Sequence, residues 1–342
     1  MTSVVTLEEW LTLKDTLPLI DVRSESEFAQ GHITGSINIP LLDNAARIEV
    51  GTLYKQMGKE AAIMKGFKLI GPKFYDLFRE VRKNAAGKEF ALYCWRGGMR
   101  SNIVAWMMAL ADYDVKLISG GYKSYRQYAH GLFAQNHKWI ILSGKTGSGK
   151  TELLRQLAIA GEQVVDLEGL AHHKGSAFGH LGELAQPTVE QFENKIAWQL
   201  RQFDMDKPVW VENESRTIGK VRVPDALFNQ MLAMPLIEIE RTEEERRKII
   251  LDEYGIYPIT ALIEATEKLE RRLGGDRMKI ACTALLSEEW QGWLDILIPY
   301  YDKTYTHSRN VRSGESHPLI LSGDRQNNLQ AVIDLSKKIW KI

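Results

Sequence analysis

Two glycine-rich stretches contain the residues of this sequence that are best suited to chemistry. The first is "CWRGGMRS", in which Cys94 is followed by Arg96, Gly97, Gly98 and Arg100. The apolar run "FALYC" leads into it, and a segment with helical apolar spacing follows it. Loop amides, a helix N-terminus and guanidinium groups favour a thiolate, and such settings lower a cysteine pKa from about 8.5 to between roughly 3.5 and 7.5. We therefore expect Cys94 to be catalytic, with the loop binding an anion or a chalcogen.

The same loop is also similar to that of the phosphotyrosine phosphatases. Its residues fit C-x-x-G-x-x-R followed by Ser or Thr. In those enzymes the thiolate attacks phosphorus while the arginine and the loop amides hold the oxygens. The length of the loop alone does not decide between phosphoryl chemistry and transfer of a sulfur or selenium atom.

The second stretch is "GKTGSGKT", which fits G-x-x-x-x-G-K-[ST] and lies between an apolar run and a helical pattern. Glycines in such a loop let backbone N–H groups face a phosphate, the lysine reaches terminal oxygens, and the last hydroxyl can hold Mg²⁺. The predicted diphosphate-binding residues are Gly144, Lys145, Thr146, Gly147, Ser148, Gly149, Lys150 and Thr151, and Thr151 is the candidate Mg²⁺ ligand. The motif predicts a di- or triphosphate ligand without specifying a nucleoside.

Carboxylates end two apolar runs that follow this loop. Asp166 and Glu168 end "EQVVDLE", and Glu212 and Glu214 lie in "VWVENESR", which also contains Arg216. Carboxylates at such positions could hold a metal ion or its water. A solvated strand end is an equally good interpretation of Glu212 and Glu214. These five residues are the candidate substrate or metal site.

Two adjacent histidines follow Glu168 in "GLAHHKGSAFG". His172 and His173 must point in different directions on any regular backbone, so we do not expect them to bind one metal ion. A loop that contacts an anion or a substrate is the better interpretation.

The elements that position these residues alternate between short apolar runs and helical patterns, as in an α/β fold with parallel sheets. The predicted strands are "LPLIDVR", "EFALYC", "KWIILSG", "EQVVDLE", "KPVWVEN", "MPLIEIE" and "HPLILSG". Capping boxes are predicted at Thr6 to Glu9, Ser24 to Glu27 and Thr242 to Glu245. Because binding groups gather at the carboxyl ends of parallel strands, we expect Asp21, Arg23 and Cys94 to lie near one another.

The length of 342 residues suits two domains, each with its own core. We predict a first domain at residues 1–130, a linker at 131–138, and a second domain at 139–342. The second domain has a helical insertion at about 242–310, where the sequence is long, charged and helical in pattern.

The balance of charge limits how the chain could bind a polyanion. Lys plus Arg and Asp plus Glu each number 44, so a nucleic acid would have to bind local basic patches. In "YKSYRQYAHG" two cations alternate with tyrosines that could stack on bases, although the end of an amphipathic helix would have the same pattern. The helical insertion carries a second basic set, which could also be merely solvated. The candidate nucleic-acid-binding residues are Lys123, Arg126, Arg246, Arg247, Arg271 and Arg272.

The cysteine count and the hydropathy pattern favour a cytoplasmic protein. Cys94 and Cys282 cannot make a disulfide framework, and the N-terminus lacks the pattern of an export signal. No run of about 18 apolar residues occurs, so we expect no contact with a membrane interior. Cys282, on a predicted helix, is expected to be a core residue.

Longer blocks of sequence resemble known families. "LIDVRSESEFAQGHITGSINIP" is similar to the rhodanese family, which carries a transferable sulfur on its loop cysteine. The common loop of that family has one residue fewer before the arginine, so the present loop is wider. Together with "VGTLYKQMGKEAA", "VVDLEGLAHHKGSAFG", "VWVENESRTIG" and "ERRLGG", the chain resembles the tRNA 2-selenouridine synthase family over nearly its whole length.

The resemblance implies a rhodanese-like domain followed by a P-loop domain and an enzyme that acts on 2-thiouridine at the wobble position of tRNAs for Lys, Glu and Gln. It implies that the sulfur is first geranylated from geranyl diphosphate and then replaced by selenium from selenophosphate, with Cys94 carrying or receiving the selenium. The P-loop would then bind a prenyl diphosphate in place of ATP, with Mg²⁺ as a candidate cofactor. We assign no residues to the geranyl chain, and we expect a monomer.

Two other classes of function remain open. One is a sulfurtransferase or a cysteine-dependent phosphatase fused to a nucleotide kinase, which would turn over ATP without tRNA. The other is a non-enzymatic module that binds tRNA or relays sulfur, with Cys94 only accepting sulfur.

Overall fold

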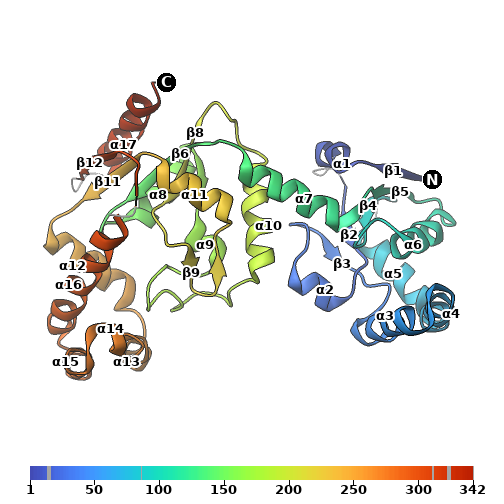
Figure 1. Ribbon diagram of the computed structural model, residues 1–342, viewed down its shortest axis with the longest axis horizontal. Coiled ribbons are helices and arrows are strands. Elements are labelled where there is room, and N and C mark those ends of the chain that lie inside the picture. Colours follow the sequence, from blue (N-terminus) through green and yellow to red (C-terminus); the bar gives the residue numbers. More distant parts are fainter. Residues whose placement is uncertain (14–16, 86, 310–311, 322–324, 342) are drawn as a thin grey trace. The chain divides into compact units, whose positions relative to one another are not determined.

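The chain folds into two units, Met1–Leu132 and Phe133–Ile342, and each is described by itself (Figure 1). The computed structural model describes residues 1–13, 17–85, 87–309, 312–321 and 325–341. Within these ranges each unit contains a five-stranded sheet in which all the strand pairs are parallel. The predicted α/β class with parallel sheets is therefore confirmed.

The sheet of the first unit has the strand order β1-β5-β4-β2-β3. Its strands are β1 (Thr2–Val5), β2 (Leu19–Asp21), β3 (Ile37–Asn38), β4 (Glu89–Tyr93) and β5 (Asp114–Ile118). Crossovers between parallel strands need intervening segments, and helices supply several of them. These helices are α1 (Leu7–Leu13), α2 (Glu25–Gln30), α5 (Phe74–Asn84) and α6 (Met99–Ala109). The central strand β4 is buried from Phe90 to Tyr93, as expected for a strand with both faces covered.

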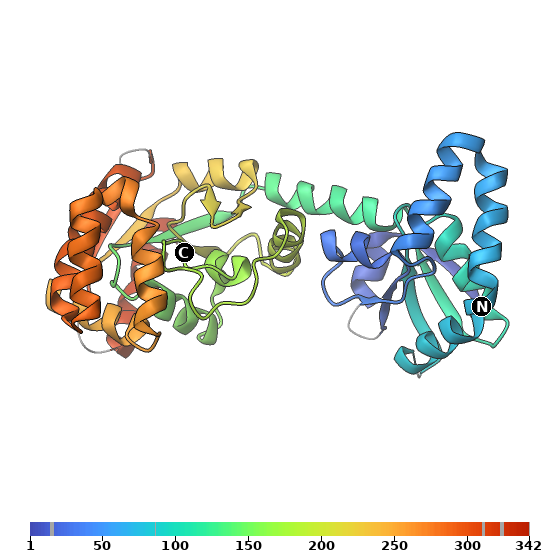
Figure 2. The same cartoon turned by 90° about the horizontal axis from the view of Figure 1, so that it is seen from below.

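A helical hairpin is inserted between β3 and α5. It consists of α3 (Asn44–Met57) and α4 (Lys59–Ile70), with the short helix η1 (Gly71–Lys73) after it. Gly58 alone separates α3 from α4, and its φ of 87° lies in the left-handed region that favours glycine. Figure 2 shows the two helices side by side, extending away from the sheet of this unit.

The sheet of the second unit has the order β12-β11-β6-β8-β7. Its strands are β6 (Lys138–Ser143), β7 (Gln163–Val165), β8 (Pro208–Glu212), β11 (Leu236–Glu240) and β12 (Ser316–Ile320). The helices outside the insertion are α8 (Lys150–Ile159), α9 (Leu167–Ala171), α10 (Val189–Leu200), α11 (Asp225–Ala233) and α17 (Arg325–Trp340), and a small hairpin pairs β9 (Thr217–Ile218) with β10 (Val221–Arg222). The strand β6 lies at the centre and is buried from Trp139 to Ser143, so the residues after it leave the middle of the sheet.

Among the described residues between β11 and β12, in the sequence predicted as a helical insertion, there are five helices. They are α12 (Glu243–Tyr254), α13 (Ile259–Glu267), α14 (Glu270–Leu273), α15 (Gly275–Leu286) and α16 (Trp290–Arg309). They enclose an apolar cluster that includes Leu262, Trp293 and Leu294. Phe178, from the segment after the two histidines, packs edge-on against Trp293 with ring centroids 5.5 Å apart. That segment is therefore anchored on the helical layer of its own unit.

The local signals in the sequence are reproduced. Each predicted strand run contains a strand, and the three capping boxes are confirmed by reciprocal hydrogen bonds at Thr6, Ser24 and Thr242. Residues 131–134 of the segment predicted as a linker belong to α7 (Gly121–Ala134), because Leu132 and Phe133 are buried apolar residues that extend the helix. Among the described helices, none has both the length and the apolar character needed to cross a membrane.

Candidate active sites

Cys94 lies in the loop that joins the carboxyl end of β4 to α6. Its side chain is 4% exposed, and its Sγ lies 3.3 Å from the Ser101 Oγ and accepts a hydrogen bond from the Gly98 N–H at 3.3 Å. Gly97 has a φ of 64°, and a Cβ there would lie 2.7 Å from the Ile118 carbonyl oxygen. The loop thus folds tightly around the sulfur because a glycine occupies its most crowded position.

The surroundings of Cys94 favour the thiolate. Burial raises the pKa of the thiol. Hydrogen bonds from the Ser101 side chain and from the backbone of Ser101 and Arg96 lower the pKa, as does the charge of Arg100, and together these effects outweigh burial. The net pKa of Cys94 is below its ordinary value, in the direction that the sequence predicts.

Arg100 binds a carboxylate of its own unit. Its Nη1 donates to the Glu27 Oε2 at 2.6 Å and its Nη2 donates to the Glu27 Oε1 at 3.1 Å. Glu27 also accepts the Ser24 N–H at 3.1 Å, so one side chain caps α2 and positions the arginine of the thiol loop. Arg96, in contrast, is exposed. Of the two predicted anion-binding arginines, Arg96 is therefore the one whose side chain is open to solvent.

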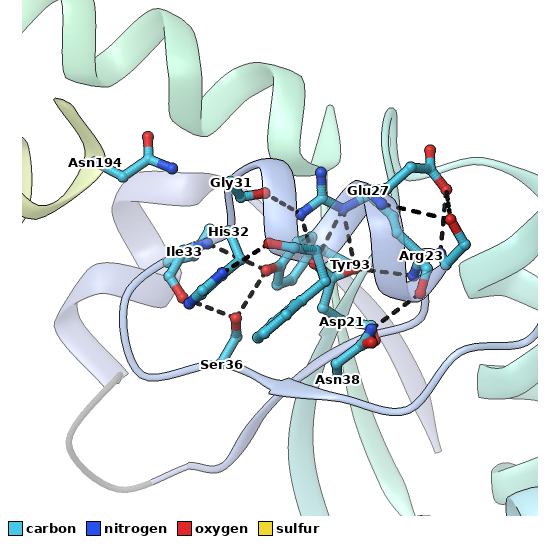
Figure 3. Close-up of polar contacts among 12 residues, drawn as sticks. Asp21, Arg23, Glu27, Gly31, His32, Ile33, Ser36, Asn38, Tyr93 and Asn194 are labelled. Atoms are coloured by element: carbon cyan, nitrogen blue, oxygen red, sulfur yellow. Dashed lines mark hydrogen bonds and ion pairs between the residues drawn. The ribbon is translucent and has the colours of Figure 1, made fainter. Parts of the chain in front are cut away.

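Asp21 and Arg23 lie at the same edge of the sheet, but they bind each other inside the unit (Figure 3). The Arg23 Nη2 donates to the Asp21 Oδ2 and to the Gly31 carbonyl oxygen, both at 2.6 Å, and neither side chain is more than 1% exposed. Burial lowers the pKa of Arg23, but the hydrogen bond and charge of Asp21 outweigh this effect and raise it. This ion pair is structural.

Other residues of the rhodanese-like block hold the chain against β4 and β2. The Tyr93 hydroxyl accepts the Ile33 N–H at 3.2 Å and lies 2.9 Å from the Ser36 Oγ. The Asn38 side chain donates to the carbonyl oxygens of residues 21 and 23 at 3.0 and 2.9 Å. These polar contacts fix the segment that precedes the helical hairpin.

The prediction that tyrosines of α7 stack on nucleic-acid bases is wrong for Tyr122 and Tyr125. Both are fully buried, because they lie on the face of α7 that packs inward. The Arg23 guanidinium lies 3.9 Å from the centroid of the Tyr122 ring, and the Tyr125 ring stacks on Tyr122. Lys123 is exposed, and Arg126 and Tyr128 are both partly buried, so the two cations and one tyrosine of the predicted patch reach the surface.

The P-loop occupies the turn between β6 and α8, as the motif predicts. Gly144, Gly147 and Gly149 all have positive φ, and a Cβ at Gly147 would lie 2.7 Å from the Arg246 carbonyl oxygen. The Lys150 Nζ donates to the Gly144 carbonyl oxygen at 2.9 Å. The Ser148 Oγ is buried and has no hydrogen-bond partner among the described residues. A loop with glycines at positive φ, an inward-facing lysine and an unpartnered hydroxyl fits an anionic ligand.

Two arginines that follow β11 hold the P-loop by its carbonyl oxygens. The Arg241 Nε donates to the Ser148 carbonyl oxygen at 3.0 Å, and the Arg246 Nε donates to the Thr146 carbonyl oxygen at 2.9 Å. Arg246 also makes a bidentate ion pair with Asp302, at 3.0 and 2.5 Å, and is only 4% exposed. The prediction that Arg246 contacts tRNA is therefore wrong, because this residue faces the loop from the buried side of α12.

The other arginines of the insertion differ in exposure. The Arg247 Nη2 lies 2.7 Å from both the Glu243 and the Asp295 carboxylates, so its charge is already paired. Arg271 and Arg272 are exposed, and a hydrogen bond with Tyr300 raises the pKa of Arg272. The exposed cations of the predicted basic set are thus the two on α14.

Three carboxylates meet beside Lys150. Glu212 is 2% exposed, and its Oε1 accepts the Glu168 N–H at 2.6 Å while its Oε2 has no partner among the described residues. Burial raises the pKa of Glu168, Glu212 and Glu214, and a Glu168–Glu214 hydrogen bond is consistent with one shared proton. The charge of Lys150 opposes this effect at Glu168 and Glu214.

The remaining candidates of this group, Asp166 and Arg216, have other partners, although the charge of Asp166 also raises the pKa of Glu212. The Asp166 Oδ1 accepts the Gly169 N–H at 2.7 Å and caps α9. Arg216 pairs with Asp225 at 2.9 Å. In the ranges that the structure describes, no group of three or more His, Cys, Asp or Glu side chains is arranged to hold a metal ion.

The segment after α9 brings its backbone close to the carboxylates. Gly175 has a φ of 65°, and a Cβ there would lie 2.7 Å from the Glu214 Oε2. His172 lies 2.9 Å from the Ala185 carbonyl oxygen, whereas His173 is partly buried elsewhere and has a lowered pKa because of that burial. The histidines diverge, as the sequence predicts.

Sequence reasoning missed the side chains that support the two loops, namely Glu27, Arg241 and Asp302. The sequence indicates Glu27 only as a capping residue of a helix. No local pattern distinguishes Arg241 or Asp302 from ordinary surface charges. Cys282, predicted to be in the core, is only partly buried on α15.

Known families and proteins match the chain along most of its length. The rhodanese-like domain family matches residues 3–128, and the tRNA 2-selenouridine synthase AAA domain family matches residues 137–269. A tRNA 2-selenouridine synthase from Cupriavidus necator is 36% identical over 349 residues, which cover 90% of the chain and 91% of that relative. One from Bordetella petrii is 33% identical, covering 95% of the chain and 94% of the relative. One from Nitrosomonas eutropha is 39% identical over 69% of the chain and 63% of the relative.

Proposed function

The chain belongs to the tRNA 2-selenouridine synthase family, and from this premise we propose how its two units divide the reaction. A wobble 2-thiouridine is first S-geranylated with geranyl diphosphate, and selenium from selenophosphate then replaces the geranylated sulfur. The P-loop of the second unit serves the first step, and Cys94 of the first unit serves the second. The substrates are tRNAs for Lys, Glu and Gln.

Geranyl transfer requires neutralisation of a diphosphate leaving group. The bond between geranyl C1 and oxygen breaks as the bond between C1 and the uridine sulfur forms, so negative charge grows on the diphosphate. Lys150, the P-loop amides and the N-terminus of α8 supply positive potential there. An ion such as Mg²⁺ would add a Lewis acid, and it would take its ligands from the Thr151 hydroxyl and from the diphosphate itself.

The selenium step requires a nucleophilic group that is shielded from water. S-alkylation converts the sulfur at C2 of the base into a group that can depart as geranyl thiol. Cys94 is buried, accepts an amide N–H and has a lowered pKa, so it is suited to carry or receive selenium. Arg96, which is an exposed residue of the thiol loop, is the arginine available to bind the phosphate part of the donor.

The tRNA must bind where cations are exposed. The exposed candidates are Lys123 on α7 and Arg271 and Arg272 on α14, and Arg126 on α7 is partly exposed. Arg246 and Arg247 instead form ion pairs with carboxylates of the second unit. We propose the first four as phosphate contacts, because nonspecific contacts to a nucleic acid are made mainly by lysine and arginine.

The position of Arg100 disfavours the phosphatase alternative. In that chemistry the arginine of the loop must hold the phosphoryl oxygens, but here both Nη atoms of Arg100 donate to Glu27. The wider loop of this chain therefore has a supporting arginine at the position where a phosphatase needs a substrate-binding one.

The observation that carries the proposal is the buried side chain of Cys94, whose Sγ accepts the Gly98 N–H and whose pKa lies below its ordinary value. The test is to incubate the protein with an anticodon RNA that contains 2-thiouridine, geranyl diphosphate and selenophosphate, and to weigh the digested nucleosides by mass spectrometry. The wild type should yield 2-selenouridine, and Cys94→Ser should stop at the S-geranyl nucleoside. Equal loss of both products in Cys94→Ser would refute the division between the units, and brisk ATP hydrolysis without RNA modification would favour the kinase alternative.

A further inference from the structure

A pocket of about 720 Å³ lies beside the thiol loop within the first unit. The helical hairpin of α3 and α4 forms one side of it, and Met99, Arg100 and Ile103 of α6 form the other. Since α6 begins directly after the Cys94 loop, Arg100 lines the pocket and its charge also lowers the pKa of Cys94. Its volume falls in the range of about 300–1,000 Å³ that is usual for small-molecule sites.

The lining of the pocket is mainly apolar. Its walls include Leu41, Leu42, Ile63, Ile70 and Ile103. Several apolar side chains at its mouth are open to solvent, because Ile48 is 69% exposed, Phe67 is 52% exposed and Met99 is 47% exposed. Contiguous exposed apolar surface of this kind on a soluble unit favours a ligand or partner that covers it.

Cations line the edge of the same pocket. Arg47 and Arg100 both pair with Glu27, at 3.5 and 2.6 Å. Lys55 and Lys59 are exposed, and among the described residues neither has an ion-pair partner. An apolar interior with two unpaired lysines at the edge complements a ligand that joins a hydrocarbon chain to an anionic part.

We propose that this pocket binds the geranyl chain of the geranylated wobble nucleotide, with Lys55 and Lys59 contacting the flanking phosphates. This assignment rests on the proposed function and deepens it. During the exchange of sulfur for selenium, C2 of the base has to reach Cys94, and the chain on the departing sulfur extends several ångströms from that carbon. The apolar surface next to the thiol loop is placed to receive that chain.

Photocrosslinking locates the chain directly. An anticodon stem-loop RNA that carries an S-geranyl-2-thiouridine analogue with a diazirine on the chain is irradiated with the full-length wild-type protein, and the labelled peptides are sequenced. The proposal predicts labels within residues 41–70 and 99–103. Labels confined to residues 139–342 would overturn it.

Matched variants test whether the pocket recognises the chain. Ile48→Asp places a carboxylate at the mouth of the pocket, and Met64→Asp places one on α4 outside the lining, at a residue that is 67% exposed compared with 69% for Ile48. We expect Ile48→Asp to weaken binding of the S-geranyl RNA at least about tenfold, without changing binding of the same RNA with an S-methyl group. Met64→Asp should leave both affinities unchanged.

The outcomes separate this proposal from the proposed function. If the wild type binds S-geranyl and S-methyl RNA equally, or if Ile48→Asp affects both alike, the pocket does not hold the chain. If Ile48→Asp instead dissolves a dimer seen by light scattering while RNA binding is unchanged, the pocket binds a second copy and the proposal fails. A failure of the wild type to geranylate 2-thiouridine RNA would count against the proposed function, and it is read in a different assay from the binding of pre-geranylated RNA.

Discussion

Replacing Arg246 by alanine tests whether this residue supports the P-loop or binds tRNA. The side chain is 4% exposed and makes three hydrogen bonds, one to the Thr146 carbonyl oxygen and two to the Asp302 carboxylate. Arg246→Ala therefore removes a buried cation, leaves the P-loop carbonyl without its donor, and leaves the Asp302 carboxylate with the Lys145 ammonium 3.5 Å away. We expect both the stability of the second unit and its affinity for geranyl diphosphate to fall.

The size of the loss follows from the burial of the pair. Breaking a buried ion pair by removing one partner costs about 3–5 kcal/mol. Asp302 is 26% exposed, so water will solvate part of the carboxylate that is left behind, and we reduce the expected cost to about 2–3 kcal/mol. In a unit of this size 1 kcal/mol shifts the Tm by about 2–4 °C, so the Tm of the second unit should fall by about 4–12 °C.

The assay is thermal unfolding of the full chain, followed by calorimetry, with Arg271→Ala as the matched control. Arg271 belongs to the same predicted basic set, but it is exposed, so its loss should change stability by no more than about 0.5 kcal/mol. Asp302→Ala and the double variant complete a mutant cycle that isolates the pair. If Arg246→Ala unfolds within about 1 °C of the wild type while its affinity for tRNA falls more than that of Arg271→Ala, the structural role assigned here is wrong.

Three further perturbations address single steps of the account. Lys150→Ala should lower the rate of geranylation of 2-thiouridine RNA by at least about a hundredfold, since it removes the cation that faces the diphosphate, and an unchanged rate would remove the P-loop from that step. Burial raises the pKa of Glu27, but Arg100, the Ser24 backbone and Arg47 together lower it below its ordinary value of 4.5. The Glu27 carboxylate therefore stabilises the first unit fully above pH 4.5, and this effect is lost as the pH falls through the folded pKa. Chemical denaturation of Glu27→Gln should show a weaker dependence of stability on acid in that window, and an identical dependence would contradict the assignment. Gly121→Ala should destabilise the first unit by about 1–3 kcal/mol in urea, because the new Cβ would lie 2.2 Å from the Cys94 carbonyl oxygen at a φ of 57°, whereas Gly131→Ala, with nothing within 4 Å, should not.

The features that could be predicted from the sequence are those that depend on neighbouring residues. The P-loop and the thiol loop each consist of one short stretch between a buried strand and a helix, so glycine spacing and apolar runs are sufficient to place them. The capping boxes have the same local character. For this reason the position of Cys94 after a strand and that of Lys150 at the start of a helix followed from the sequence.

The features that were missed or mistaken depend on which way a helix faces and on contacts between distant residues. Tyr125 and Arg246 look like surface residues in a charged helical segment, but each lies on the face that packs inward. Arg246 meets Asp302 across 56 positions of sequence, and Arg100 meets Glu27 across 73. No periodicity in a single segment reports such a pair, because the pairing is created only when the units fold.

The separation of geranylation from selenium transfer is tested most directly by giving the Lys150→Ala variant an RNA that is already geranylated. The variant is mixed with selenophosphate and an anticodon RNA that contains S-geranyl-2-thiouridine, and the digested nucleosides are weighed. The account predicts that Lys150→Ala forms 2-selenouridine at close to the wild-type rate while Cys94→Ser forms none. A Lys150→Ala protein that cannot use the geranylated RNA, or a Cys94→Ser protein that can, would contradict the assignment of selenium transfer to the first unit.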